Sequence, residues 1–311
     1  MQTLIIFNPY SGRGAGLRAK DSLCAALKRA EIKFDMVETE HAGHAILLAH
    51  RARIGGYSTV VAAGGDGTIS EVVNGLMRAS VSDGSALAGT LGVMPIGSGN
   101  DFATMVGASL DLEQAAERLA AGQTRIVDVG RAHYKVEGVW SDRYFDNNMG
   151  LGLEAAVIIE SNKIRRLRGV ILYATAAVRA LIKQKSPHMH LRWEGADGEI
   201  GERDEGTLLV SVGNSQRAGG GFYLTPDARL DSTLLDVAIA KDISRPAVLA
   251  LLPRAMFGKH TGHPAVTMLR IKKLTIAIAD GAPMQMDGEI MAEKVNEVEI
   301  TVLPQRLRVI V

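Results

Sequence analysis

The stretch GGDGTISEVVNGL, residues 64–76, decides the fold of this chain. It follows the run TVVAA at 59–63, whose β-branched and small apolar residues predict a buried strand. Beyond the glycines, apolar residues recur at helical spacing and predict a helix over 69–77. A strand that passes through a glycine-rich turn into a helix is the repeating unit of parallel α/β sheets. The stretch therefore predicts a Rossmann-like layer.

The residues on either side of this stretch repeat the same alternation. Strands are predicted at 3–7, 34–38, 59–63 and 91–95, and helices at 17–30, 44–54 and 69–77, with a further helix beginning near Asp101. Short strands that alternate with longer helices predict βαβ units and a mostly parallel sheet. The first domain is predicted to cover residues 1–127.

Three glycine-rich segments begin where predicted strands end: NPYSGRGAG at 8–16, GGDGT at 64–68 and PIGSGND at 95–101. Ligands of open α/β sheets bind outside the carboxyl ends of the strands, so these loops predict a phosphate cradle. Helices that begin at Ile69 and near Asp101 would direct backbone N–H groups at the anion. Asp66 offers a carboxylate where Mg²⁺ usually accompanies phosphates. The combination predicts binding of a nucleoside triphosphate.

Two common nucleotide-binding fingerprints are absent from the sequence. No GxxxxGK[ST] occurs, which excludes a P-loop enzyme. The first segment is spaced GxGxG and not GxGxxG, which disfavours a nicotinamide dehydrogenase.

The second half of the chain has a different pattern. Short strands are predicted at 125–129, 144–147, 189–193, 208–212, 235–240, 274–279 and 298–303. Closely spaced strands of this kind predict an antiparallel sandwich or open barrel, here over residues 128–304. Two helices, 161–185 and 243–257, interrupt the strands.

The motifs together resemble the diacylglycerol kinase catalytic-domain family, which includes soluble bacterial lipid kinases. They are NPYSG at 8–12, GGDGTISEVVNGL at 64–76, PIGSGNDFA at 95–103 and DGE at 287–289. GGDGT alone is shared with NAD kinases and phosphofructokinases, whereas the four in this order are more specific. The resemblance implies an NAD kinase/diacylglycerol kinase-like α/β domain and a β-sandwich, with the last strand, within 305–311, returning to the first domain.

The resemblance also implies a reaction and a site. The expected activity is transfer of the γ-phosphate of ATP, with Mg²⁺, to a lipid hydroxyl. Glu289, with Asp287 on the same turn, is the expected general base and would face the nucleotide across a cleft. Asp-Gly is also a common hairpin sequence, so a plain turn is the alternative. The expected nucleotide-binding residues are Asn8, Ser11, Thr39, Gly64, Gly65, Asp66, Gly67, Thr68, Ile69, Ser70, Ser98, Asn100 and Asp101.

One motif departs from the family pattern. Relatives carry an accessory Mg²⁺ site in a segment resembling AxLDDGLLD, whereas this chain reads ARLDSTLLD at 228–236. Asp231 remains as a candidate ligand, but Ser232 and Thr233 replace the second Asp and the Gly. Loss of a carboxylate weakens a site for a hard cation, so family-like affinity is not expected.

A run of basic residues falls in the first predicted helix of the second half. It is either a solvated surface or a landing site for anionic lipid. The segment 213–226, with Phe222 and Tyr223, either borders the acceptor pocket or forms a hairpin loop. Nothing in the sequence selects among diacylglycerol, sphingosine, ceramide and phosphatidylglycerol. The basic residues are Lys163, Arg165, Arg166, Arg168, Arg179, Lys183 and Lys185.

Composition narrows the remaining choices. Lys and Arg number 35 against 34 Asp and Glu, so the chain lacks the basic excess of a nucleic-acid-binding protein. A single cysteine, together with the absence of a signal-like segment or a membrane-spanning run, predicts a cytoplasmic protein. The resemblance to lipid kinases adds the expectation of peripheral contact with the inner face of the membrane. The alternatives to a lipid kinase are an NAD kinase and a catalytically silent lipid- or nucleotide-binding protein. A homodimer is the default expectation.

Overall fold

The chain divides into two compact units. A computed structural model describes all residues except 1, 165–166, 168 and 218–221. The first unit comprises Met1–Val129 and Pro304–Val311, and the second comprises Gly130–Leu303. The sequence predicted the first domain to end at residue 127 and the second at residue 304. Two strands, β5 (Thr124–Val136) and β12 (Glu289–Ile310), contribute residues to both units.

The first unit is built on a parallel sheet. Its strands lie in the order β2-β1-β3-β4-β12, and the end of β12 pairs with β4 through Arg308 and Val309. β1 and β3 are buried along their whole length, as expected of strands covered on both faces. The strand order reverses between β1 and β3, which is where open parallel sheets bind ligands. The other strands of this sheet are β1 (Thr3–Phe7), β2 (Phe34–Glu38), β3 (Thr59–Gly64) and β4 (Thr90–Pro95).

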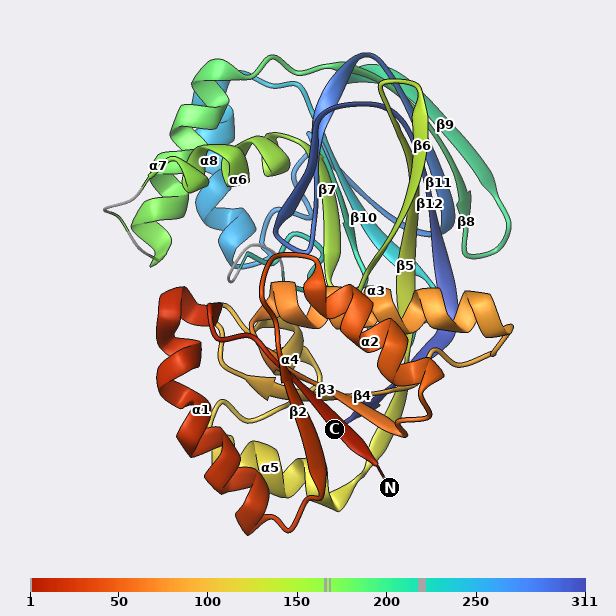
Figure 1. Ribbon diagram of the computed structural model, residues 1–311. Helices are drawn as coiled ribbons and strands as arrows, with labels where there is room; N and C mark the ends of the chain where they lie inside the picture. The colour runs from red at the N-terminus through yellow and green to blue at the C-terminus, as the bar shows by residue number, and fades with distance from the viewer. Residues whose placement is uncertain (1, 165–166, 168, 218–221) are drawn as a thin grey trace. The chain divides into compact units, whose positions relative to one another are not determined.

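Helices cover the sheet of the first unit (Figure 1). Leu23 and Leu27 of α1 and Leu119 of α5 pack in one core cluster with Ile5 and Phe7. α2 and α3 pack closely on each other, and a Cβ atom at Gly75 would lie 2.3 Å from the carbonyl oxygen of Ile46. The helices are α1 (Ser11–Arg29), α2 (His44–Ile54), α3 (Asp66–Asp83), α4 (Asp101–Met105) and α5 (Leu112–Ala121).

Two of these helices begin earlier than the sequence predicted. α1 begins at Ser11 and not at residue 17, and α3 begins at Asp66 and not at residue 69. Gly65 stands before α3 in an extended conformation, and its carbonyl accepts hydrogen bonds from the amides of Thr68 and Ile69. A carboxylate in the first turn, here Asp66, also favours the positive end of the helix dipole. The glycine-rich motifs are therefore largely helix starts.

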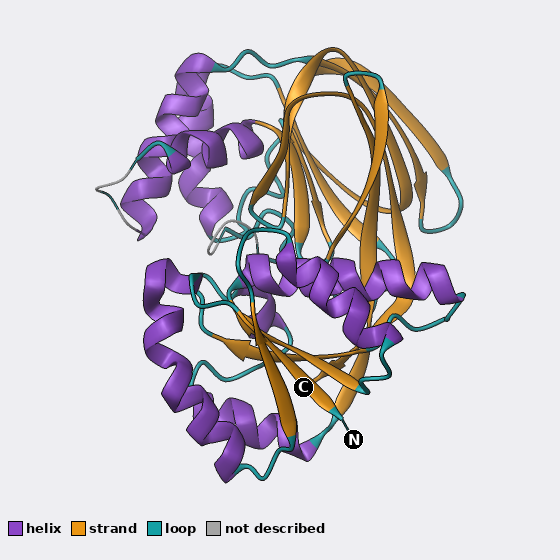
Figure 2. Ribbon diagram, viewed as in Figure 1, coloured by secondary structure: helices purple, strands orange, loops and turns teal. Residues whose placement is uncertain are grey.

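The second unit is rich in antiparallel strands, as predicted (Figure 2). The order is β10-β9-β7-β11-β12, with β8 paired to β9 and β11, and β5 paired to β6. A large apolar cluster fills the core between its strands, and a smaller one lies where the helices of this unit pack on the sheet. The strands are β6 (Val139–Phe145), β7 (Asn148–Gly152), β8 (His188–Gly195), β9 (Ile200–Gly213), β10 (Leu235–Lys241) and β11 (Val266–Met286).

Three helices lie together on one side of this sheet (Figure 1): α6 (Leu153–Asn162), α7 (Gly169–Lys183) and α8 (Arg245–Met256). The prediction of a single helix over 161–185 is wrong, because the structure has two separate helices, α6 and α7, in this region. The Glu160 carboxylate contacts the Nζ atoms of Lys163 at 3.0 Å and Lys183 at 2.9 Å, which ties their ends together. Arg165, Arg166 and Arg168 lie outside the described residues. Among the described residues, no helix is long and apolar enough to cross a membrane.

Candidate active site

Asn8 connects two of the glycine-rich segments of the first unit. It follows β1 directly, and its backbone amide donates to the carbonyl of Ala63 in β3 at 2.9 Å. Its side-chain Nδ2 donates to Thr68 Oγ1 at 2.9 Å, and its carbonyl accepts from Ser11 Oγ at 3.0 Å. These bonds hold the ends of β1 and β3 together where the strand order reverses.

The second and third segments meet through two glycines. A Cβ atom at Gly97 would lie 2.4 Å from Gly65 Cα and 2.6 Å from Asn100 Oδ1, so only glycine fits. Asn100 has a left-handed backbone with φ of 54°, and both polar atoms of its side chain bond to the backbone of Gly97. Its Oδ1 accepts from the Gly97 amide at 2.9 Å, and its Nδ2 donates to the Gly97 carbonyl at 3.0 Å. The two segments therefore meet through bare backbone, an arrangement that would let an anion approach closely.

Asp66 joins the two helices that start at this edge. Its Oδ1 accepts from the backbone amide of Phe102, in α4, at 3.1 Å. Asp101, the first residue of α4, is buried. With one oxygen of Asp66 engaged in holding α4, a Mg²⁺ ion in this cradle would depend chiefly on phosphate oxygens.

The remaining predicted nucleotide-binding residues lie in different surroundings. Thr39 is buried just after β2, and its amide donates to the Phe7 carbonyl at 2.9 Å. Ser98 is exposed in the third segment. Ile69 and Ser70 lie within α3 with buried side chains, so those side chains face the core.

Glu71 is a supporting residue of this region that the motif analysis did not single out. Its Oε1 accepts from the Gly43 amide at 2.7 Å, and its Oε2 accepts from the Ala45 amide at 3.0 Å. The carboxylate thus caps the N-terminus of α2 from α3, the helix that follows the predicted phosphate cradle.

In the second unit, the DGE motif forms a tight hairpin turn between β11 and β12. Asp287 and Gly288 have φ values of 47° and 84°, which is the backbone of a type I′ turn. The Asp287 carboxylate accepts hydrogen bonds from the amides of Asn147 and Asn148 at 3.0 Å each, and of Asp146 at 3.3 Å. Asp287 therefore orders residues 146–148, and its geometry is that of a positioning residue.

Glu289 leaves this turn with a partly accessible carboxylate. Its side chain is 38% exposed, and its Oε2 lies 2.9 Å from Nη2 of Arg143, whose side chain is 13% exposed. The ion pair fixes the orientation of the carboxylate. Sequence reasoning missed Arg143, because an arginine on a strand carries no motif and the pairing spans 146 residues.

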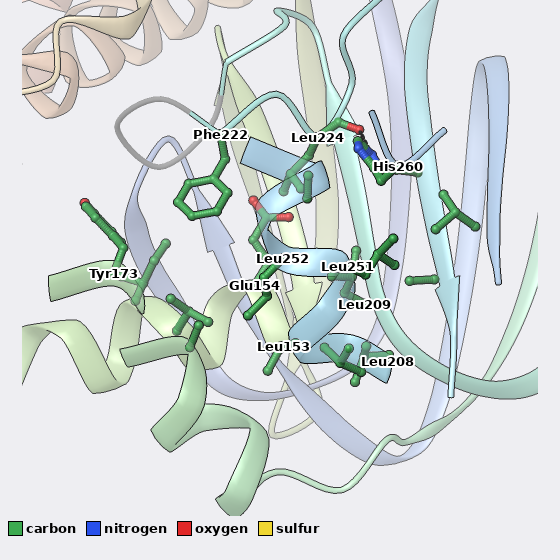
Figure 3. Close-up of a pocket in the computed structure, with 18 residues that line it drawn as sticks. Leu153, Glu154, Tyr173, Leu208, Leu209, Phe222, Leu224, Leu251, Leu252 and His260 are labelled. Carbon is green, nitrogen blue, oxygen red and sulfur yellow. Dashed lines mark hydrogen bonds between the residues drawn. The ribbon is translucent and has the colours of Figure 1, made fainter. Parts of the chain in front are cut away.

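The helices of the second unit line an open apolar pocket of about 120 Å³ (Figure 3). α6, α7, α8, β9 and β10 all contribute walls, and Phe222 and Leu224 come from the segment 213–226 that was predicted to border an acceptor pocket. Residues 218–221 of that segment lie outside the described residues. The residues lining the cavity are Leu153, Glu154, Val157, Ile158, Tyr173, Ala177, Leu208, Leu209, Phe222, Leu224, Ala238, Ala240, Val248, Leu251, Leu252, Ala255, His260 and Val266.

Glu154 is a carboxyl group in this apolar wall that the sequence analysis missed. Its Oε1 accepts from Asn148 Nδ2 at 2.6 Å and from Gln285 Nε2 at 2.8 Å. Burial raises the pKa of Glu154 to about 7, although hydrogen bonding with Ser211, Asn148 and Gln285 lowers it. Gln285 Oε1 also accepts from the Gly288 amide at 2.9 Å, so one amide side chain links the cavity wall to the DGE turn.

The segment 228–236 is where relatives are expected to hold an accessory metal, and family-like affinity is not expected in this chain. Asp231 lies 3.5 Å from the guanidinium of Arg229, and the Ser232 hydroxyl donates to the Leu234 carbonyl at 3.0 Å. Within the described parts of the chain, no three His, Cys, Asp or Glu side chains are grouped as they would be around a metal ion. Asp231 as a metal ligand stays a prediction.

Comparisons with known proteins agree with this arrangement of motifs. A model of the diacylglycerol kinase catalytic domain matches residues 2–132, and a model of the YegS C-terminal NAD kinase β-sandwich-like domain matches residues 147–311. A diacylglycerol kinase of Staphylococcus aureus is 28% identical over 286 residues, which are 92% of this chain and 85% of the relative. One from Staphylococcus carnosus is 27% identical over 288 residues, 92% of this chain and 87% of the relative.

Solved structures show the same fold. A diacylglycerol kinase from Bacillus anthracis superposes with a TM-score of 0.71 at 20% identity, covering 99% of this chain and 96% of that one. A yeast NADH kinase superposes with a TM-score of 0.54 at 11% identity, covering 100% and 83%. The two family models together account for nearly the whole chain, so this protein belongs to the diacylglycerol kinase family of lipid kinases.

Proposed function

We propose that the protein transfers the γ-phosphate of ATP to the hydroxyl of a membrane lipid, with Glu289 as the general base. The observation that carries the proposal is the Gln285 side chain, which bonds both Glu154 in the apolar cavity and Gly288 in the turn that presents Glu289. A lipid seated in the cavity would hold its polar end beside the candidate base.

The first unit supplies the nucleotide site in this proposal. The bare backbone at Gly65 and Gly97 allows phosphate oxygens to approach, and the N-terminus of α3 adds a favourable dipole. Mg²⁺ bound to the nucleotide would neutralise charge on the phosphates. Asn8, Thr68 and Asn100 keep the three segments in place.

The second unit supplies the acceptor side. The Glu289 carboxylate takes the proton of the lipid hydroxyl as the hydroxyl oxygen bonds to the γ-phosphorus and the bond to the leaving ADP oxygen breaks. Arg143 orients Glu289, and Asp287 holds the neighbouring chain at 146–148. We assign Asp287 a positioning role in this reaction.

Contact with the membrane surface is proposed for α7. Its exposed side chains include Ile171, Val178 and Ile182, spaced seven and four residues apart and therefore on one face. Arg179 and Lys185 are exposed close by, which gives a basic rim suited to anionic lipid. Tyr173 and Ala177 of the same helix line the cavity, so lipid at this surface would lie next to its walls.

The test is transfer of label from γ-labelled ATP, with Mg²⁺, to a mixed lipid extract in detergent micelles, with NAD as a parallel acceptor. We expect label in a product that partitions into organic solvent. Label in NADP would identify a nucleotide kinase. ATP binding without transfer to any lipid would identify a silent binding protein.

A further inference from the structure

The turn between β2 and α2 presents a stacked pair of imidazole rings. The ring centroids of His41 and His44 lie 4.9 Å apart, with an interplanar angle of 14°. His44 is fixed to the turn, because its Nδ1 accepts from the backbone amide of Glu40 at 3.1 Å. His41 is exposed, and its Nδ1 donates to the carbonyl of Ala42 at 2.9 Å. The inner ring is thus held by the backbone, and the outer ring extends the stack toward solvent.

Backbone hydrogen bonds place this turn beside the predicted phosphate cradle. The amide of Thr39 donates to the carbonyl of Phe7 at 2.9 Å. The next residue, Asn8, bonds to the Thr68 hydroxyl in the second glycine-rich segment. Because β2 pairs with β1 in parallel, their carboxyl ends meet at the same edge of the sheet. The turn therefore continues the edge on which the glycine-rich segments lie.

Glu71 sets the spacing between this turn and the cradle. Its carboxylate accepts from the amides of Gly43 and Ala45 at 2.7 and 3.0 Å. Glu71 follows Gly65 by six positions along α3, which is about 9 Å at the usual helical rise. The ribose and inner phosphate of a nucleotide can span such a length. With its outer phosphates at Gly65 and Gly97, a nucleotide can reach the turn with its base.

We infer that the His41 ring stacks on the purine base of the bound nucleotide, with His44 as the positioning residue beneath it. The inference rests on the proposed ATP-dependent function, and it names a contact with the phosphate donor that no motif assigns. Imidazole rings are among the side chains on which nucleobases stack. A purine offers two fused rings to such a surface and a pyrimidine only one, so purine nucleotides should bind more tightly.

The experiment measures Kd by isothermal titration, with Mg²⁺ and without lipid, for ATP, CTP and inorganic triphosphate. Inorganic triphosphate lacks the ribose and the base, so it reports on the cradle alone. The proteins are the wild type, His41→Ala, His41→Phe and His44→Ala. His188→Ala, which removes an exposed imidazole from β8 of the second unit, serves as control. His41→Phe keeps a flat ring but removes both ring nitrogens.

We expect His41→Ala to raise Kd for ATP about tenfold, because stacking on the base is lost. Its Kd for inorganic triphosphate should equal that of the wild type. His41→Phe should bind ATP at least as tightly as the wild type, since a flat ring remains. His44→Ala should raise Kd for ATP by a smaller factor and leave triphosphate binding unchanged, whereas a general disturbance of the fold would weaken both. His188→Ala should match the wild type throughout.

The wild type alone provides a second measurement, which needs no variant. Its Kd should be lower for ATP than for CTP, because the larger ring system overlaps more of the imidazole. In His41→Ala this difference should shrink, since the stacking surface is gone.

Equal losses of ATP and triphosphate affinity in His41→Ala would mean that the turn shapes the cradle and does not contact the base, and would overturn the inference. An unchanged Kd for ATP, or equal wild-type Kd values for ATP and CTP, would do the same. A loss in His41→Phe as large as in His41→Ala would show that a ring nitrogen acts in place of stacking. Each of these outcomes leaves the lipid kinase intact, whereas a wild-type protein that bound no ATP would contradict the proposed function itself.

Discussion

At the scale of single residues, the contact between Gly65 and Gly97 leaves no room for a side chain in the predicted phosphate cradle. A methyl group at position 97 would overlap the Gly65 backbone and the Asn100 side chain. The Asn100 side chain is held in place by its two hydrogen bonds to Gly97. We expect Gly97→Ala to weaken ATP binding about tenfold or more, because the two segments must separate. Isothermal titration with ATP measures this, and Gly262→Ala, whose added methyl meets open space, serves as control. ATP affinity equal to wild type in Gly97→Ala would show that the cradle lies elsewhere.

Thr233 shows a second residue-scale effect, in the segment that departs from the family motif. Its φ is 61°, a left-handed conformation that a β-branched residue adopts only under strain. Relatives are expected to carry glycine at this position. Thr233→Gly should therefore raise the free energy of unfolding by about 1 kcal/mol, since the strain disappears. Urea denaturation measures the change. A loss of stability would mean that the threonine side chain contributes more than its backbone costs.

At the scale of elements, α6 carries Glu154, and the burial of this carboxyl group should make the free energy of unfolding depend on pH. The ordinary pKa of 4.5 rises to about 7 in the folded chain, so between these pH values the folded state binds more protons than the unfolded state. The contribution of Glu154 to the free energy of unfolding therefore falls as pH rises through this range. The penalty is absent below pH 4.5 and complete above pH 7, where it amounts to about 3 kcal/mol.

Glu154→Gln removes this titration. We expect the stability of the variant relative to wild type to increase from pH 4 to pH 8 by up to about 3 kcal/mol, as followed by urea denaturation at each pH. Glu202→Gln, which removes a carboxylate that is 59% exposed, serves as control. A difference that stays constant with pH would show that Glu154 titrates normally.

The elements also show what sequence patterns can and cannot predict. β1, β2 and α2 were predicted to the residue because runs of strand-forming residues and helical spacing are local signals. The starts of α1 and α3 were predicted too late, because the glycine-rich segments were interpreted as loops. In α3, the amides of Thr68 and Ile69 bond to the Gly65 carbonyl, so the helix already begins within the glycine-rich segment. The break between α6 and α7 was missed because basic and apolar residues continue without interruption along this part of the sequence. Such a pattern does not show where one helix ends and the next begins.

The site shows a similar limit. Glu289 and the three glycine-rich segments could be proposed from motifs, because each is contiguous in sequence. Arg143, Glu154 and Gln285 could not, since their relevance depends on contacts between residues more than a hundred positions apart. A lone glutamate in an apolar helix carries no sign of the cavity it will face.

At the scale of the whole molecule, the account predicts recruitment to anionic membranes. Each basic residue near such a surface contributes about 1 kcal/mol, so the double variant Arg179→Glu, Lys185→Glu should lower binding to phosphatidylglycerol vesicles more than tenfold. Sedimentation with vesicles measures this. Lys28→Glu with Arg51→Glu makes the same charge change in the first unit and serves as control. If the Arg179→Glu, Lys185→Glu variant sedimented with vesicles as well as the wild type, α7 would not be the membrane-binding surface.

The central claim is that Glu289 takes the proton from a lipid hydroxyl. The most direct measurement is the single-turnover rate of label transfer from γ-labelled ATP into lipid, for wild type and Glu289→Gln, at saturating ATP and lipid. We predict a fall of about 10² to 10⁴ in the rate of transfer with ATP affinity unchanged, because a neutral amide cannot accept the proton. A Glu289→Gln protein that transfers label at the wild-type rate would contradict the account.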